Sequence, residues 1–430
     1  MATLGITCPP LPGHLNPMLV MGAELQARGH RVVVLNVADA GDRVRAKGLE
    51  FGLLGETDFP PGSLTTWQQA LPKRSQSSAV RSTAALLANI ARVVLRDSAE
   101  LISGLGIEGL IVDQAEYGGS TVAEALSLPY VTVANGFHLN REPGVPSAYT
   151  SWLPNSGWAA RIRDRTVYTI EEYMYGLFLG RGVNQRRAQL GLRPYRWERE
   201  CYSPLAQLSQ CPRALDYPRS QLPAVWHGVG PLRADTESEP GFPFEQLDGR
   251  PLVYASLGSL QGNRRSVFAA IAAACAPLGV QLVITHGHQL AVEETTGFAG
   301  DPLVVPYAPQ RALLARASLV VTHAGMNTVL DALSAGVPMV AIPLTFEQPA
   351  IAARLAWHGA GEVVPPRRAS AARIRRAVAR VLGATHYRES AQRLSRAIAA
   401  EGGVGRAADV VEAAIRTRRP VPSSGVTSSQ

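Results

Sequence analysis

The sequence predicts an α/β protein with two Rossmann-like, doubly wound domains that face a cleft. Short apolar runs alternate with segments of helical period along most of the 430 residues, which is typical of parallel sheets built from βαβ units. The alternation stops near the middle of the chain and then restarts, which indicates two domains. The chain length fits two or three domains.

The expected N-terminal domain spans residues 1–215. Its buried strands are predicted from the apolar runs LGITCP, HRVVVLNV, GLIVDQ and PYVTVAN, and its helices from MLVMGAELQARG, closed by Gly29, and TAALLANIARVVLRDSAELISG. Residues 147–212 break this pattern and are rich in aromatic side chains. These aromatics could line an apolar pocket, or they could be core. They are Trp152, Trp158, Tyr168, Tyr173, Tyr175, Phe178, Tyr195, Trp197 and Tyr202.

Residues 216–250 are rich in proline, glycine and acidic residues, as expected of an interdomain linker. The expected C-terminal domain spans 251–400, where strands are predicted from LVYASLG, VQLVITHG, PLVVPY, SLVVTHAG, PMVAIP and GEVV. A terminal helix over 401–418 is a candidate to pack back on the N-terminal domain. Residues 419–430 are expected to be disordered.

Charge and cysteine content narrow the function classes. The formal net charge is +8, but the arginines that supply it are scattered, so the sequence predicts no nucleic-acid partner. A weak attraction to anionic membrane surfaces is compatible with this charge. Without a signal-like leader or an 18-residue apolar run, we expect a cytoplasmic protein, with peripheral contact at the inner membrane surface left open. Four cysteines without zinc spacing should be reduced and structural: Cys8, Cys201, Cys211 and Cys275.

Three motifs imitate functional sites. GLGIEG at 104–109 fits GxGxxG but ends a helix and precedes a strand, the reverse of the order in nucleotide-binding folds. ASLGS lacks the first glycine of a nucleophile elbow. His286 and His288 have no acidic cluster nearby in the sequence. Because a DxD motif is also missing, we expect no metal and no separate cofactor.

The stretch VVTHAGMNTVLDALSAGVP at 320–338 predicts a strand, a turn and a helix. The turn places His323 and Gly325 beside the first amides of the helix, and a helix N-terminus binds anions without lysine. Asn327 and Thr328 are donors suited to phosphate oxygens, while Gly325 allows close approach. Asp331, one turn into the helix, can accept hydrogen bonds from ribose hydroxyls. Taken singly, these residues also fit ordinary helix capping and a core histidine.

Residues 307–348, YAPQRALLARASLVVTHAGMNTVLDALSAGVPMVAIPLTFEQ, resemble the signature box of UDP-sugar-dependent glycosyltransferases. From His323 to Gln348 the pattern H-x-G-x-N-[ST]-x-x-[DE]…GVP…P…[DE]Q fits without a gap. The resemblance extends over essentially the whole chain, although it is loose across 147–250. It implies the two-domain GT-B fold, with an acceptor-binding domain over 1–215 and a UDP-sugar-binding domain over 251–400. It also implies UDP-glucose as the donor substrate.

The resemblance also implies roles in donor binding. Tyr307 would stack on uracil and Gln310 would bond the uridine. Asp331 would hold the ribose, and Glu347 and Gln348 the sugar hydroxyls. The residues expected to contact the diphosphate are Ser259, His323, Asn327 and Thr328. The plant pattern has a glutamate where this chain has Asp331 and an aspartate where it has Glu347, so both positions keep their negative charge.

The motif PPLPGHLNP places His14 on a loop after the first strand, and Asp113 ends the strand GLIVD. Each residue alone could be a capping residue. In the family that the chain resembles, the catalytic histidine lies in this motif, with its partner aspartate about 100 residues later. The resemblance therefore implies an inverting displacement, in which His14 takes the proton of the acceptor hydroxyl. Asp113 would orient His14 and stabilise its protonated form.

For the acceptor, residues 110–146 resemble bacterial zeaxanthin glucosyltransferases, through VDQ, AEALSLP and NREPGVP. We therefore expect a lipophilic acceptor, with a hydroxycarotenoid first. Flavonoids, macrolides or other small molecules are the alternative acceptors. A UDP-sugar 2-epimerase is disfavoured by the GHxxP histidine and the terminal EQ, and a non-catalytic sugar-nucleotide sensor by the intact His14 and Asp113. The oligomeric state stays open.

Overall fold

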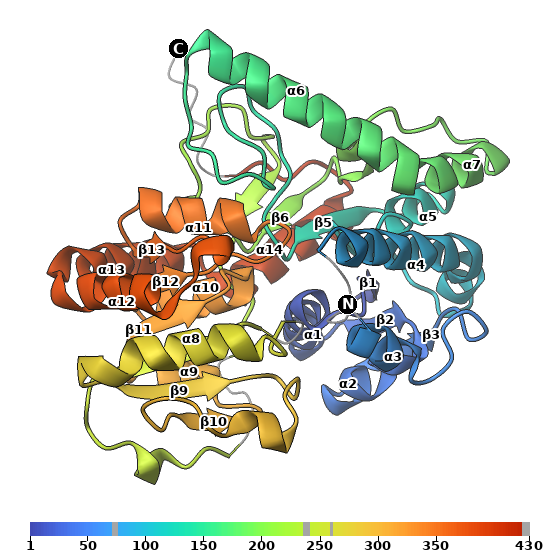
Figure 1. Cartoon of the computed structure of the whole chain (residues 1–430). Coiled ribbons are helices and arrows are strands. Elements are labelled where there is room, and N and C mark those ends of the chain that lie inside the picture. Colours follow the sequence, from blue (N-terminus) through green and yellow to red (C-terminus); the bar gives the residue numbers. More distant parts are fainter. Residues whose placement is uncertain (71–75, 235–240, 259–260, 424–430) are drawn as a thin grey trace.

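The computed structural model describes residues 1–70, 76–234, 241–258 and 261–423. It confirms the predicted fold class, with two parallel sheets covered by helices (Figure 1). The first sheet has the order β3-β2-β1-β4-β5-β6-β7 and the second the order β10-β9-β8-β11-β12-β13. In each sheet the order reverses between the first and fourth strands, and ligands of doubly wound sheets bind at that point.

The first sheet consists of β1 (Thr3–Thr7), β2 (Arg31–Asn36), β3 (Glu50–Leu53), β4 (Gly109–Asp113), β5 (Tyr130–Ala134), β6 (Gln207–Ser209) and β7 (Trp226–Gly228). Its helices are α1 (Pro12–Ala27), α2 (Gly41–Ala46), α3 (Ser63–Ala70), α4 (Gln76–Gly104), α5 (Gly119–Ala125), α6 (Trp158–Tyr175) and α7 (Arg181–Gln189). A π-helical turn, Gly176–Gly180, joins α6 to α7.

The second sheet consists of β8 (Leu252–Ser256), β9 (Gln281–Thr285), β10 (Leu303–Val305), β11 (Ala317–Thr322), β12 (Met339–Ala341) and β13 (Gly361–Val363). Its helices are α8 (Arg265–Cys275), α9 (Gln310–Leu314), α10 (Met326–Ser334), α11 (Gln348–Trp357), α12 (Ala371–Gly383) and α13 (Thr385–Ala400), followed by α14 (Gly403–Thr417). Every strand predicted from an apolar run is present.

The strands read as continuous apolar runs because both faces of each sheet are covered. Along β2, Val32 and Val34 enter the core on one face, while Val33 and Leu35 enter the core on the other. The same alternation divides β8 between the two cores of the second sheet. All four cysteines are buried and free of disulfides, as predicted.

Three features differ from the sequence reading. Strands β3, β6 and β7 were not predicted, and β7 lies inside the stretch expected to be a linker. Helix α1 starts at Pro12, a residue suited to a first helical turn, so His14 is helical and not in a loop. Residues 419–423, which were expected to be disordered, lie against the N-terminal half of the chain. There the Val421 N–H donates to the Leu205 carbonyl at 2.8 Å. The remaining residues of the expected tail lie outside the described ranges.

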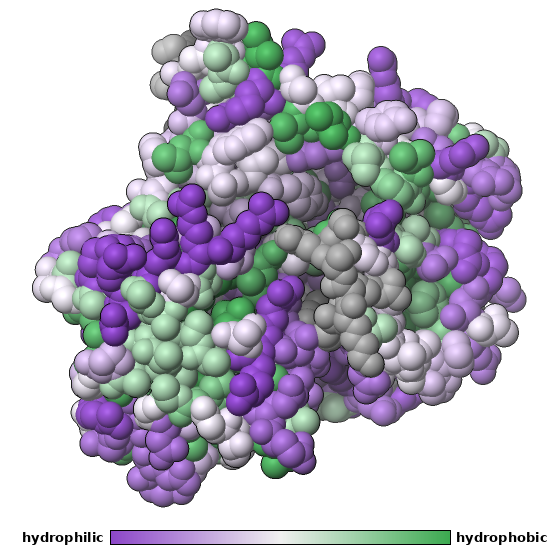
Figure 2. Space-filling view, in the orientation of Figure 1, coloured by the Kyte–Doolittle hydropathy of each residue, from purple (hydrophilic) through white to green (hydrophobic). Residues whose placement is uncertain are grey.

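The last helix, α14, packs on the N-terminal half of the chain. Its Ala407, Val411 and Ala414 join the core that contains residues of β1 and β2. Arg28, which caps the C-terminus of α1, pairs with Asp409 at 2.7 Å. Among the described helices, none is long and apolar enough to cross a membrane. The outer helix α6 runs along one edge of the molecule in Figure 1. In the same orientation, hydrophobic residues are exposed among hydrophilic ones along that band (Figure 2).

Candidate active site

His14 and Asp113 meet at the carboxyl ends of two neighbouring strands. His14 lies in the first turn of α1, just after β1, and Asp113 is the last residue of β4. Because β1 and β4 pair in parallel, their ends share one edge of the sheet. The Nδ1 atom of His14 is 2.9 Å from the Asp113 Oδ2 atom. This contact leaves Nε2 of His14 as the ring nitrogen that can exchange a proton with a ligand.

The Asp113 carboxylate is held rigidly. Its side chain is 1% exposed. Its Oδ1 accepts a hydrogen bond from the Ala115 N–H at 2.7 Å, and its Oδ2 accepts a second from Asn135 Nδ2 at 2.6 Å. Asn135 follows the end of β5, so three adjacent strand ends contribute to this cluster. Fixed acceptors of this kind orient an imidazole and stabilise its protonated form.

The surroundings of His14 set its proton affinity. Burial lowers the pKa of His14, but the charge and hydrogen bond of Asp113 and the charge of Glu347 outweigh it, so the net pKa is raised. The side chain is still 26% exposed, so it can reach a ligand in the cleft. A histidine with a raised pKa is a stronger base than free imidazole, and a larger share of it is protonated near neutrality.

Glu347 comes from the opposite domain, at the N-terminus of α11. Burial raises the pKa of this carboxyl group, while a backbone hydrogen bond and the His14 charge lower it. A Cβ atom placed on Gly136, just after β5, would lie 3.8 Å from Glu347 Oε1. Glu347, which is predicted to bind the sugar hydroxyls, therefore lies against the strand ends of the N-terminal sheet.

Helices α1 and α10 begin next to each other across the cleft. Asn327, in the first turn of α10, donates from Nδ2 to the Gly13 carbonyl at 3.1 Å. No side chain among the described residues caps the first turn of either helix. The N-terminus of α10 thus meets the start of α1, where the His14 and Leu15 N–H groups already donate to the Leu11 carbonyl. A helix N-terminus attracts anions.

His323 follows β11 and lies between two glycines. Burial lowers its pKa to about 4, although a hydrogen bond to the Ser256 backbone opposes this shift, so the ring is neutral near pH 7. A Cβ atom on Gly325 would lie 2.4 Å from His323 Nε2, and one on Gly258 would lie 2.7 Å from its Cε1. Gly325 therefore makes room for the imidazole, a use that the sequence alone did not indicate.

The turn at His323 is conformationally unusual. Ala324 has φ +65°, in the left-handed region that non-glycine residues rarely adopt. Phe346, just before Glu347, has φ +51°, and His288, whose ring lies 5.0 Å from that of Tyr307, has φ +59°. Such residues cost free energy and concentrate in ligand sites. Here they mark three loops at the carboxyl edge of the second sheet.

Asp331 is already engaged within the protein. Its Oδ1 accepts a hydrogen bond from Arg233 Nε at 2.7 Å, and its Oδ2 accepts one from Gln310 Nε2 at 2.6 Å. Arg233 also donates from Nη2 to Asn327 Oδ1 at 3.1 Å. Two residues predicted for the ribose and the diphosphate are thus held by one arginine, which the sequence reading left unnoticed inside the expected linker.

Arg233 also connects the two halves of the site. Its Nη1 donates to Gln210 Oε1 at 3.2 Å, and Gln210 Nε2 donates to Asn135 Oδ1 at 2.9 Å. Since Asn135 donates to Asp113, one hydrogen-bonded chain runs from the Asp113 carboxylate to Asp331. Buried networks of this kind hold their members in a single arrangement.

The other predicted donor-site residues occupy varied settings. Tyr307 is 44% exposed, so its ring is available for stacking. Thr328 is buried in the first turn of α10. Gln348 is buried and holds its own loop, because its Oε1 accepts hydrogen bonds from the Leu344 and Thr345 N–H groups at 2.8 and 2.9 Å. Ser259 lies outside the described residues.

A family model described as UDP-glucoronosyl and UDP-glucosyl transferase matches residues 106–399. The chain belongs to this family. It is a glycosyltransferase, and membership implies a nucleotide-sugar donor and a small-molecule acceptor. A zeaxanthin glucosyltransferase of Pantoea ananas is 34% identical over 98% of each chain. One from Pseudescherichia vulneris is 34% identical over 96% of this chain and 98% of its own.

More distant relatives and solved structures agree on the class and the fold. A 4'-demethylrebeccamycin synthase of Lentzea aerocolonigenes is 27% identical over 94% of this chain and 97% of its own. The calicheamicin glycosyltransferase CalG4 superposes with a TM-score of 0.71 at 23% identity, covering 98% of this chain and all of its own. At that identity the likeness shows the GT-B fold alone.

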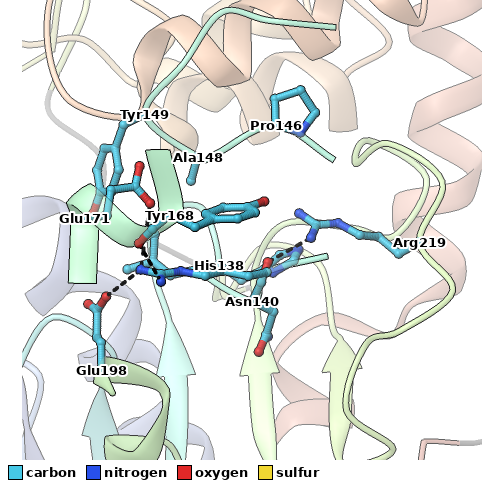
Figure 3. Close-up of a pocket in the computed structure, with 11 residues that line it drawn as sticks. His138, Asn140, Pro146, Ala148, Tyr149, Tyr168, Glu171, Glu198 and Arg219 are labelled. Atoms are coloured by element: carbon cyan, nitrogen blue, oxygen red, sulfur yellow. Dashed lines mark hydrogen bonds and ion pairs between the residues drawn. The ribbon is translucent and has the colours of Figure 1, made fainter. Parts of the chain in front are cut away.

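The glycosyltransferase has a polar pocket beneath α6 (Figure 3). Tyr168 and Glu171 of α6 line it together with His138, Tyr149 and Glu198, among others. Burial raises the pKa of Glu198 to about 7, although the charge of Arg141 opposes the shift. The empty space of the pocket and its mouth is about 280 Å³, open solvent included, but only about 10 Å³ of it can hold the centre of a water molecule. The pocket thus has room for about one water molecule.

The pocket lies near the His14 cluster, because Asn135, which donates to Asp113, is three residues before His138 of the pocket lining. Burial raises the pKa of Tyr149, and the charges of Glu198 and Glu347 raise it further. Glu347 in turn acts on the pKa of His14. Within the described ranges, no group of three or more His, Cys, Asp or Glu side chains is arranged to hold a metal ion.

Proposed function

We propose that this glycosyltransferase moves glucose from UDP-glucose to a hydroxyl group of a lipophilic acceptor, a hydroxycarotenoid such as zeaxanthin, with inversion at the anomeric carbon. The observation that carries the mechanism is the 2.9 Å contact between His14 and the buried Asp113, on a cleft shared with the N-terminus of α10. The acceptor class is supported by 34% identity to zeaxanthin glucosyltransferases over almost the whole chain.

The reaction is a single displacement. The acceptor hydroxyl donates its proton to His14 Nε2 while its oxygen attacks the anomeric carbon from the face opposite UDP. The bond from that carbon to the diphosphate oxygen breaks, and UDP takes the electron pair. The proton stays on His14, where the charge of Asp113 stabilises the imidazolium. The product is a β-glucoside, because UDP-glucose is an α-glycoside.

The donor would lie across the carboxyl edge of the second sheet. Tyr307 would stack on uracil, with Gln310 and Asp331 on the uridine. The diphosphate would lie at the N-terminus of α10, whose amides stabilise the charge that develops there. The positive charge of Arg233, bonded to Asn327, adds to this field. These groups supply the neutralisation that a divalent cation would otherwise give, so we propose a metal-independent reaction.

The sugar would face the loop that carries Glu347 and Gln348. Gln348 fixes this loop, and its Nε2 donates one hydrogen to Thr345 Oγ1 at 3.2 Å. The second Nε2 hydrogen would be donated to a sugar oxygen. His323 would donate a hydrogen bond to the diphosphate as a neutral imidazole. Ser259 would complete the diphosphate contacts from the turn after β8.

The test is a transfer assay with purified full-length protein, UDP-glucose and zeaxanthin in detergent micelles, with and without excess EDTA. The expected result is a β-glucoside, identified by mass and anomeric coupling, formed at the same rate with EDTA. An α-glucoside would refute the single displacement. No product from zeaxanthin, together with fast turnover of flavonoids or macrolides, would favour the broader acceptor class. Conversion of UDP-glucose without an acceptor would indicate a 2-epimerase.

A further inference from the structure

The outer face of α6 and the following π-helical turn exposes an apolar stripe. Trp158 is 77% exposed and Tyr173 is 70% exposed, although such side chains are usually mostly buried. The stripe residues recur at helical spacing on one face. They are Trp158, Ile162, Ile170, Tyr173 and Leu177, and we call them the α6 stripe. Large exposed apolar side chains gathered on one helix face, here with the exposed Thr166 and Thr169 between them, mark a site of contact with another surface.

The charges of α6 are sorted between its two faces. Its three acidic residues point inward: Asp164 is buried and pairs with Arg163, while Glu172 pairs with Arg141 at 2.7 Å. Glu171 accepts a hydrogen bond from Ser147. The exposed charges of the helix are Arg161 and Arg165, which make no ion pair within the described residues. The outward face is therefore apolar and cationic, with no exposed acid.

The inner face of the same helix lines the pocket near the active site. Tyr168 and Glu171 point into this pocket (Figure 3). Ile170 and Tyr173 of the same turns are exposed. Exposed hydrophobic residues are visible along the α6 band in Figure 2. A surface bound to the α6 stripe would thus be separated from the pocket by the width of one helix.

We propose that the α6 stripe docks on an anionic phospholipid membrane, with Arg161 and Arg165 facing the lipid head groups. Aromatic and aliphatic side chains on one face, with arginines beside them, are what a helix lying in a membrane interface requires. The net charge of +8 adds a long-range attraction to the same surface. The purpose of this contact, access to a lipophilic alcohol within the membrane, rests on the proposed function. The contact itself does not.

The test is flotation of the full-length protein with vesicles of phosphatidylethanolamine and phosphatidylglycerol, compared with vesicles of phosphatidylcholine alone. Neither contains a carotenoid. Arg161→Gln/Arg165→Gln should lower the partition coefficient on anionic vesicles about 25-fold at low salt, since each arginine near such a surface contributes about fivefold. The matched control, Arg367→Gln/Arg368→Gln, removes two exposed arginines of the C-terminal domain and should leave binding within about twofold if only the α6 face docks.

The apolar contribution is tested by Ile162→Ser/Leu177→Ser, which should lower binding at least about tenfold. Its control, Leu53→Ser/Val292→Ser, changes two aliphatic residues that are exposed elsewhere and should bind as the wild type does. Equal loss in the stripe and control variants would overturn the proposal, as would absence of wild-type binding to anionic vesicles. A wild-type dimer that the stripe variant converts to a monomer would assign the stripe to a second copy of the chain and also overturn it.

Activity separates this proposal from the proposed function. The variant Ile162→Ser/Leu177→Ser should glucosylate zeaxanthin in detergent at the wild-type rate. On zeaxanthin in anionic vesicles it should be at least about tenfold slower than the wild type. If vesicle binding follows the stripe but zeaxanthin is no substrate, only the acceptor proposal fails. If detergent-dispersed zeaxanthin is a substrate but vesicle binding is absent, only the docking proposal fails.

Discussion

The substitution Asp113→Asn tests how the carboxylate acts on His14. In the wild type, burial lowers the pKa of His14, and the Asp113 charge and hydrogen bond, together with the smaller effect of the Glu347 charge, more than reverse this shift. An amide of the same shape removes the charge and has a single acceptor oxygen, so it can accept a hydrogen bond from Asn135 or from Ala115 but not from both. The opposing burial then dominates, so the pKa of His14 should fall below 6.5 in the variant.

The sign of the pH dependence follows from the mechanism. Only neutral His14 can accept the acceptor proton, so kcat/KM should rise with pH through the pKa of His14. The acidic limb should lie above pH 6.5 in the wild type and below it in Asp113→Asn. The plateau should fall by about 10²–10⁴, because the weaker base loses its orientation and its charge partner.

The assay is kcat/KM for UDP-glucose and a soluble alcohol acceptor between pH 5 and 9, with UDP affinity measured in parallel as the control. UDP affinity should stay close to that of the wild type, since the predicted donor contacts lie in the other domain. Acidic limbs that coincide in the two proteins would refute the role given to Asp113. So would additive losses when Asp113→Asn is combined with His14→Ala, because Asp113 is expected to act through His14.

The remaining predictions concern the donor side. Arg233→Gln should raise KM for UDP-glucose about 10- to 100-fold with a smaller effect on kcat, because it removes the charge-assisted hydrogen bond to Asp331. Arg233→Lys should recover part of the loss. Steady-state kinetics that show only a kcat effect would contradict this prediction. Gly325→Ala should displace His323 and weaken UDP binding by about 1–3 kcal/mol, which calorimetry would measure; unchanged affinity would contradict the packing argument. The diphosphate should raise the pKa of His323 from about 4, so UDP binding near pH 5 should be accompanied by proton uptake. Calorimetry in buffers of different ionisation enthalpy would measure this uptake. Its absence would mean that the diphosphate binds elsewhere.

The sequence predicted the architecture well because βαβ periodicity is a local signal. Both strand ends that position His14 and Asp113 were visible as apolar runs, so their proximity could be expected before the structure. The start of α1 was misjudged, because proline and glycine around His14 resemble a loop, whereas Pro12 begins the helix. Strand β7 escaped notice because its three residues lie among prolines.

Contacts between distant segments could not be predicted. Arg233 looked like one of many scattered arginines, and only the fold brings it to Asp331 and Gln210. Gly325 was expected to serve the ligand, yet its missing Cβ makes room for His323. The aromatic stretch proved mixed: Tyr175, Tyr195 and Tyr202 are buried, whereas Trp158 and Tyr173 are exposed. Helical spacing alone does not say which face meets solvent.

The central claim, that His14 is the base, is tested most directly with His14→Ala and a series of phenol acceptors of increasing acidity. The wild type should depend weakly on acceptor pKa, because His14 removes the proton in either case. The variant should be about 10²–10⁴ slower with weakly acidic acceptors and should recover progressively as the acceptor ionises without help. A fully active His14→Ala enzyme, or a loss of rate that is the same for every acceptor, would contradict the claim.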